Sequence, residues 1–135
     1  MKAYLAIKFY EDFSNRQEVE ALLGCLEEAG FESVCVVRDC EAWGRYTFQP
    51  SVLMQKSFDL IEASDVVVIE LSEKGVGLGI EAGYAHAKGI PVVTIAKTGS
   101  DISKTLRGIS DAVFHYHDYT DLTAPLMQLR QKLQT

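Results

Sequence analysis

The chain has 135 residues, 47% of them hydrophobic and 24% charged, a balance typical of a globular domain that folds without a disulfide. Its net charge of -6 disfavours nucleic acid and anionic membranes as partners. The three cysteines form no CxxC pair, which argues against a zinc site, and no apolar run approaches the roughly 20 residues of a membrane span. We therefore expect one cytoplasmic domain, residues 1–135, with neither metal nor cofactor.

Strand and helix patterns alternate through the first half of the chain. A capping box of Ser14 and Gln17 predicts a helix start, and Gly30 predicts the end of that helix. Pro50 suits the first turn of the next helix. The predicted elements are a strand over 2–8, a helix over 14–30, a strand over 33–37, a polar loop over 38–49 and a helix over 50–64.

The second half continues the alternation. The run DVVVIEL predicts a strand buried on both faces, as in a parallel sheet. Further elements are predicted as strands over 65–71, 90–96 and 112–116 and helices over 78–88, 102–108 and 120–134. This order predicts a three-layer α/β domain, Rossmann- or flavodoxin-like, with a five-stranded parallel sheet flanked by helices. Binding sites in such folds lie beyond the carboxyl ends of the strands.

The segment KGVGLGIEAGYAHAKGIP, residues 74–91, is the richest in chemistry. Gly75, Gly77 and Gly79 allow a sharp turn and a close approach to a ligand. Glu81 is expected in the first turn of the following helix, where the helix dipole favours a charged carboxylate. The residues alone leave three interpretations open: a catalytic or sugar-binding glutamate, a purely structural turn, or a dinucleotide site.

The dinucleotide interpretation rests on a G-x-G-x-x-A match from Gly77 to Ala82. That motif normally comes with an acidic residue at the end of the next strand, and here the next strand runs into Lys97. It also normally belongs to the first strand–helix unit, and here it falls in the third. Dinucleotide binding is therefore the least favoured of the three.

The run VGLGIEAGYAHAKG resembles the signature of nucleoside 2-deoxyribosyltransferases and of the related 2'-deoxynucleoside 5'-phosphate N-hydrolases. The flanking DVVVIEL and IPVV fit the same pattern, and residues 102–108 resemble the hydrolases' S-x-x-I-R-G segment. The resemblance implies that Glu81 is the nucleophile that attacks C1' of the sugar, and that Tyr4 orients it. It implies also that Ser103 reaches the active site of a neighbouring subunit, and so a homodimer or a higher homo-oligomer.

The chain departs from this family pattern at three places. The family carries an Asp eight residues before the Asp that opens the third strand, and this chain has Ser57 there. An Asp or Ser six residues before the nucleophile is replaced by Gly75, and the glycine-rich turn after the first strand is replaced by residues 7–10. The family's Asp assists departure of the base, and losing a general acid typically costs about 10²–10⁴-fold in rate.

Other side chains at the same edge of the sheet are candidates for binding or for the missing acid. Glu70, Asp39 and Glu41 are candidate proton donors. Trp43 is a candidate to stack on a base, and Lys8 a candidate to meet a phosphate.

The resemblance favours an enzyme that acts on a small nucleoside or nucleoside monophosphate, either hydrolysing the N-glycosidic bond or transferring the 2-deoxyribosyl group. The first alternative is a weakly active or inactive module that binds or senses nucleotides, which the missing acid at Ser57 supports. The second is an enzyme that acts on another ribosylated metabolite.

Overall fold

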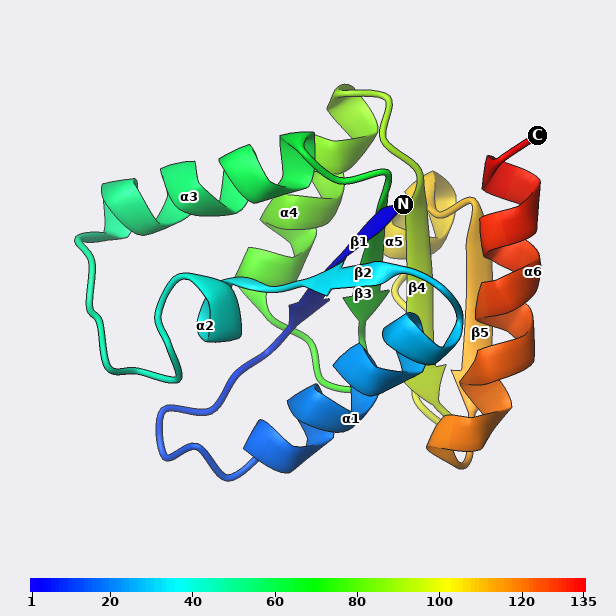
Figure 1. Cartoon of the computed structure of the whole chain (residues 1–135), viewed down its shortest axis with the longest axis horizontal. Helices are drawn as coiled ribbons and strands as arrows, with labels where there is room; N and C mark the ends of the chain where they lie inside the picture. Colours follow the sequence, from blue (N-terminus) through cyan, green and yellow to red (C-terminus); the bar gives the residue numbers. More distant parts are fainter.

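A computed structural model describes residues 1–135 and shows a parallel sheet between two layers of helices (Figure 1). The elements, in chain order, are β1 (Lys2–Ile7), α1 (Arg16–Glu28), β2 (Glu32–Val34), α2 (Val36–Asp39), α3 (Pro50–Glu62), β3 (Val66–Glu70), α4 (Val76–Ala87), β4 (Val92–Lys97), α5 (Lys104–Ile109), β5 (Ala112–Tyr116), the 3₁₀ helix η1 (Tyr119–Leu122) and α6 (Thr123–Leu133).

The sheet has five strands in the order β2-β1-β3-β4-β5, and every neighbouring pair is parallel. This confirms the predicted five-stranded parallel α/β fold. The strand order reverses at β1, which lies between β2 and β3, so the connections after β1 and β3 leave toward opposite faces of the sheet. A crevice therefore opens beyond the carboxyl ends of β1 and β3, where α/β proteins bind ligands.

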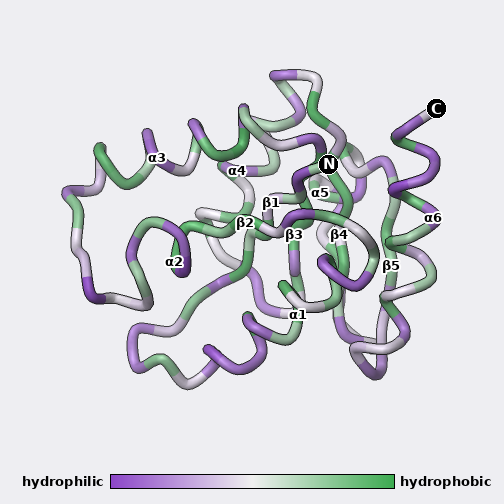
Figure 2. The backbone as a smooth tube through the Cα atoms, in the orientation of Figure 1, coloured by the Kyte–Doolittle hydropathy of each residue, from purple (hydrophilic) through white to green (hydrophobic).

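Successive side chains along each strand point to opposite faces of the sheet, so they contribute to two separate hydrophobic cores. One core contains Val66 and Val68 of β3 together with the apolar faces of α1 and α6. The other contains Val67 and Ile69 of β3 together with residues of α3, α4 and α5. Figure 2 shows the strands as mostly hydrophobic and the outer turns of α1 and α6 as hydrophilic. Successive residues at a strand end therefore face different helical layers. Only side chains that face the same layer can meet at one site.

Two local predictions in the first half were wrong. The predicted strand over 33–37 ends at Val34, and the short helix α2 follows, because the Asp39 carboxylate accepts the Cys35 N–H at 2.9 Å and satisfies a free donor at the helix start. The capping box of Ser14 does not form. Asn15 is the residue before α1, and its side chain instead ties the loop after β1 by bonds to the Lys8 carbonyl and the Tyr10 N–H.

No helix is long and apolar enough to cross a membrane. No group of three or more His, Cys, Asp or Glu side chains is arranged to hold a metal ion.

Candidate active site

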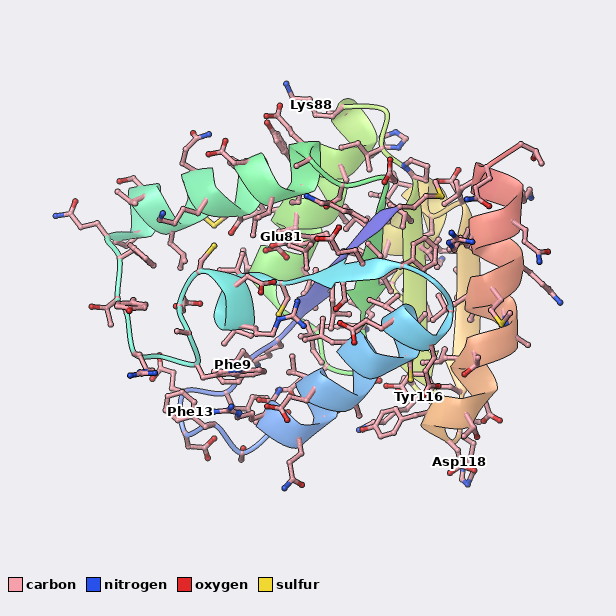
Figure 3. The ribbon with its side chains drawn as sticks, viewed as in Figure 1. Phe9, Phe13, Glu81, Lys88, Tyr116 and Asp118 are labelled. Atoms are coloured by element: carbon pink, nitrogen blue, oxygen red, sulfur yellow. The ribbon has the colours of Figure 1, made fainter.

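Glu81 and Tyr4 meet in the layer between the sheet and α4. The Tyr4 hydroxyl donates a hydrogen bond to Glu81 Oε1 at 2.9 Å. Tyr4 lies in the middle of β1 and is 1% exposed, so its ring is fixed by the core. Glu81 is half-buried and projects from α4 (Figure 3). The structure thus brings together the two residues that the family resemblance assigned to one catalytic pair.

The charge state of Glu81 differs from the sequence expectation. Helix α4 begins at Val76, two residues earlier than predicted, so Glu81 lies in the second turn, where the helix dipole has little effect. Burial raises the pKa of Glu81 to about 7, and the hydrogen bond from Tyr4 offsets part of that rise. Glu81 is therefore poised near neutral pH, rather than being held fully ionised.

Two pockets border Glu81. The first, of about 170 Å³, is mostly apolar, and we call it the apolar pocket. Its lining residues are Tyr4, Leu5, Ala6, Ile7, Phe9, Cys35, Val36, Val37, Glu41, Leu53, Met54, Ser57 and Glu81. The second, of about 300 Å³, runs along the start of α4, and we call it the glycine pocket. Its lining residues are Ile7, Lys8, Gly75, Val76, Gly77, Leu78 and Glu81. A carboxylate between an apolar and a polar compartment suits attack on a sugar that links a flat base to a polar group.

The three glycines have different positions from those predicted. Gly75 precedes α4 in extended backbone, whereas Gly77 and Gly79 are inside the helix and make no turn. Gly77 is one helical turn before Glu81, on the same face, and a Cβ there would meet no atom within 4 Å. Its missing side chain therefore leaves open space beside the carboxylate. Gly79 borders neither pocket.

Ser57 lies in α3, is 3% exposed and borders the apolar pocket. Its hydroxyl donates to the Leu53 carbonyl at 3.1 Å, so its proton is already engaged within the helix. Lys8, at the carboxyl end of β1, borders the glycine pocket, and its ammonium group pairs with Glu73 at 2.9 Å. Ser57 and Lys8, two of the seven residues predicted to bind substrate, therefore border the two pockets beside Glu81, one in each.

Trp43 does not line either pocket. Its ring packs against Phe9, with ring centres 5.9 Å apart, and the Arg16 guanidinium stacks on it, 4.4 Å from the ring centre. Besides Tyr4, the aromatic side chain that borders the apolar pocket is Phe9, which sequence reasoning missed. The aromatic replacement of a glycine-rich turn after β1 is the signal that could have found it.

Ser103 precedes α5, where its hydroxyl accepts the Leu106 N–H at 3.4 Å as a helix cap. It borders neither pocket within its own chain. Glu70, a candidate acid, is on the other face of the sheet from Glu81. Its carboxylate accepts hydrogen bonds from the Ser72 N–H, the Ser72 hydroxyl and the Tyr116 hydroxyl. Glu70 is thus removed from the candidates for proton donation at Glu81.

Comparisons with known proteins agree with this fold. A CMP N-glycosidase from Clostridium botulinum superposes with a TM-score of 0.65 at 21% identity, over 98% of this chain and 99% of that chain. A 2-deoxyribosyltransferase from Bacillus psychrosaccharolyticus gives 0.70 at 18% identity, over 93% and 96% of the two chains. The fold is that of the nucleoside deoxyribosyltransferases.

A relative found by sequence comparison identifies the family within this fold. A protein of Thermofilum pendens that carries the provisional name 2'-deoxynucleoside 5'-phosphate N-hydrolase 1 is 30% identical over 136 residues, covering 98% of this chain and 95% of the relative. The chain therefore belongs to the 2'-deoxynucleoside 5'-phosphate N-hydrolase family. No family model matches it.

Proposed function

We propose that the protein hydrolyses the N-glycosidic bond of a nucleoside or a nucleoside 5'-monophosphate, with Glu81 as the nucleophile. The observation that carries the proposal is the Tyr4–Glu81 hydrogen bond of 2.9 Å at the junction of the two pockets. The relative from Thermofilum pendens is named as an N-hydrolase, which favours hydrolysis over transfer of the sugar to a second base.

The reaction follows from the chemistry of a buried carboxylate. In the first step an oxygen of the Glu81 carboxylate bonds to C1' of the sugar, and the electron pair of the C1'–N bond leaves with the base. In the second step a water oxygen attacks C1', a proton is lost to solvent, and the Glu81 carboxylate is released. The Tyr4 hydroxyl holds the nucleophilic oxygen in place through the hydrogen bond that it donates.

The glycine pocket supports a phosphorylated substrate. Helix α4 has no side-chain cap, so the first backbone N–H groups at its start remain available to an anion. Lys8 adds a cation to the same pocket, although in the free protein it pairs with Glu73. We expect Lys8→Met to raise KM for a nucleoside monophosphate about tenfold and to leave KM for the matching nucleoside unchanged. Equal changes for both substrates would contradict a phosphate role for Lys8.

We propose also that the protein forms at least a homodimer in which Ser103 approaches the Glu81 of the partner. Ser103 borders neither of the pockets beside the Glu81 of its own chain, so a role in catalysis requires a second subunit. Light scattering at micromolar concentration should give at least twice the monomer mass of 15.0 kDa. A monomeric mass would contradict the shared site.

A second candidate function is a nucleotide-binding module with little turnover. The observation that favours it is Ser57, whose engaged hydroxyl cannot supply an acid proton at neutral pH. This function predicts that Glu81→Gln still binds nucleotides in calorimetry and that the wild type releases no base.

The decisive experiment incubates the protein with a panel of nucleosides and their 5'-monophosphates and follows the released base by chromatography. Mass spectrometry of the wild type quenched during turnover should find the sugar attached to the peptide that contains Glu81. Turnover with an adduct on another residue would overturn the assignment of the nucleophile. Inactivity on the whole panel, with retained binding, would favour the binding module.

A further inference from the structure

The apolar pocket contains one carboxyl group besides that of Glu81, and it belongs to Glu41. Glu41 follows α2, while Glu81 projects from α4, so two segments that are far apart in the sequence bring their carboxyl groups to one cavity. The walls near Glu41 are apolar and include Val36, Val37 and Leu53. Two carboxyl groups in one cavity, with different surroundings, are the arrangement that glycoside-cleaving sites use for acid and nucleophile.

The Glu41 carboxyl group has no partner, in contrast to that of Asp39 two residues earlier. Asp39 accepts hydrogen bonds from the Arg38 guanidinium and from the Cys35 N–H, each at 2.9 Å. No hydrogen bond or ion pair engages the side chain of Glu41, and burial alone raises its pKa. The Asp39 carboxyl group is therefore occupied by structural contacts, whereas the Glu41 carboxyl group borders the pocket without a partner.

The backbone after Glu41 is held in an uncommon conformation. Ala42 and Trp43 have φ values of 46° and 57°, and neither is a glycine. The Trp43 N–H donates to the Val37 carbonyl at 2.8 Å, and the Trp43 ring is fixed between Phe9 and Arg16. Left-handed non-glycine residues persist only where the surroundings impose them, and they gather at functional sites. The side-chain packing of Trp43 thus imposes the turn that follows Glu41.

We propose that Glu41 is the general acid that protonates the departing base, the role that the family's Asp fills at the position of Ser57. This assignment rests on the proposed function. As the C1'–N bond breaks, the Glu41 carboxyl group gives its proton to a nitrogen or oxygen of the base, which leaves neutral. The Glu41 carboxylate then takes a proton from the water that attacks C1', and this returns the site to its starting state.

Other ionisable groups that face Glu41 do not compete for this role. Tyr4 and Cys35 border the same pocket, and burial raises the pKa of both, to about 11 for Cys35. Cys40, the preceding residue, also has a raised pKa because of burial. Burial makes all three groups weaker acids than usual, and Glu41 supplies the carboxyl group of this pocket that is not the nucleophile.

The test compares two leaving groups in Glu41→Gln. An ordinary nucleobase needs a proton to leave, whereas para-nitrophenolate does not, so a para-nitrophenyl 2-deoxyriboside reports the nucleophilic step alone. For the natural base we expect kcat to fall about 10²–10⁴-fold. For the nitrophenyl substrate we expect kcat to change by less than about threefold. The alkaline fall of the wild-type rate profile should also disappear in Glu41→Gln.

The matched control is Glu32→Gln, since Glu32 is an exposed carboxylate at the opposite end of the sheet from the site. It should retain wild-type rates on both substrates. An equal loss on both substrates in Glu41→Gln, a rise in KM without a change in kcat, or no effect at all would each overturn the acid role. If the wild type cleaves neither substrate, the proposed function and the assignment of Glu41 are both overturned. If Glu81→Ala loses cleavage and Glu41→Gln does not, the proposed function stands and the assignment of Glu41 is wrong.

Discussion

Two carboxylates lie near the carboxyl end of the sheet on opposite faces, and their surroundings differ sharply. Glu70, at the end of β3, faces the α1 and α6 layer, is 2% exposed and accepts three hydrogen bonds. Glu81 faces the other layer, is half-buried and accepts one side-chain hydrogen bond, from Tyr4. Figure 3 shows Tyr116, a donor to Glu70, near α1, and Glu81 apart from it on α4.

The difference separates a carboxylate whose oxygens are saturated with donors from one that keeps free lone pairs beside open space. The donors around Glu70 satisfy its charge and join the ends of β3 and β5, so Glu70 has little left to offer a ligand. Glu81 has lost much of its water without gaining enough donors, which is why its pKa rises to about 7. An under-solvated anion beside open space is a good nucleophile.

The largest expected effect is on turnover. Glu81→Ala should reduce kcat by about 10⁴-fold or more, since the proposed mechanism bonds the sugar to the Glu81 carboxylate and alanine offers no nucleophile in its place. The fold should survive, because the side chain is half-buried and contributes little packing. Base release measured by chromatography, with circular dichroism as the control for folding, checks this. Wild-type turnover in Glu81→Ala would contradict the distinction between the two carboxylates.

The complementary effect is on stability. Glu70→Ala leaves the buried Tyr116 hydroxyl and the Ser72 N–H without an acceptor, and should lower the free energy of unfolding by about 3 kcal/mol. Urea denaturation followed by circular dichroism measures the loss. An unchanged midpoint would show that water satisfies these donors equally well.

The raised pKa of Glu81 predicts a pH-dependent cost to the fold. The unfolded carboxyl group titrates near 4.5 and the folded one near 7, so the unfolded chain releases its proton first as pH rises. Stability from this group is therefore complete below pH 4.5 and falls until about pH 7, by roughly 3 kcal/mol in all. Glu81→Gln should be more stable than the wild type at pH 8 and equal to it at pH 4. Parallel stability curves for the two proteins would contradict the burial of the charge.

The smallest effect concerns Tyr4. Removing its hydroxyl in Tyr4→Phe takes away the donor that favours the ionised form of Glu81. The acid limb of the kcat/KM profile should move about one pH unit upward, and kcat/KM at neutral pH should fall about tenfold. The ring stays in the core, so stability should change little. A lower rate with an unmoved acid limb would indicate that Tyr4 acts only on substrate binding.

Sequence patterns predicted what depends on neighbouring residues along the chain. The apolar run of β3 and the alternation of strands and helices identified the sheet, because burial on both faces leaves a continuous hydrophobic signature. The resemblance of the glycine segment to a known family pointed to Glu81 and Tyr4, which the fold then places in contact. Residues that are far apart in the chain were paired only through that resemblance.

The parts that could not be predicted depend on tertiary packing. Trp43 was expected at the ligand, but it lies in a left-handed turn with its ring packed against Phe9 and Arg16. No pattern in the sequence predicts that two successive non-glycine residues, Ala42 and Trp43, have positive φ values. Glu70 and Glu41 were equal candidates in sequence. The alternation of side chains along β3 turns Glu70 away from Glu81, whereas the chain after α2 brings Glu41 into the apolar pocket.

The contact between Gly44 and Phe13 bears on how fast a ligand binds. Gly44 has a φ of 86°, and a Cβ there would lie 2.5 Å from the Phe13 ring, so the loops after β1 and α2 interlock. The wall that these loops build is complete before any ligand arrives, and association then loses little conformational entropy to loop ordering. Stopped-flow binding should accordingly follow a single exponential whose rate rises linearly with ligand concentration, without the plateau of a closing lid.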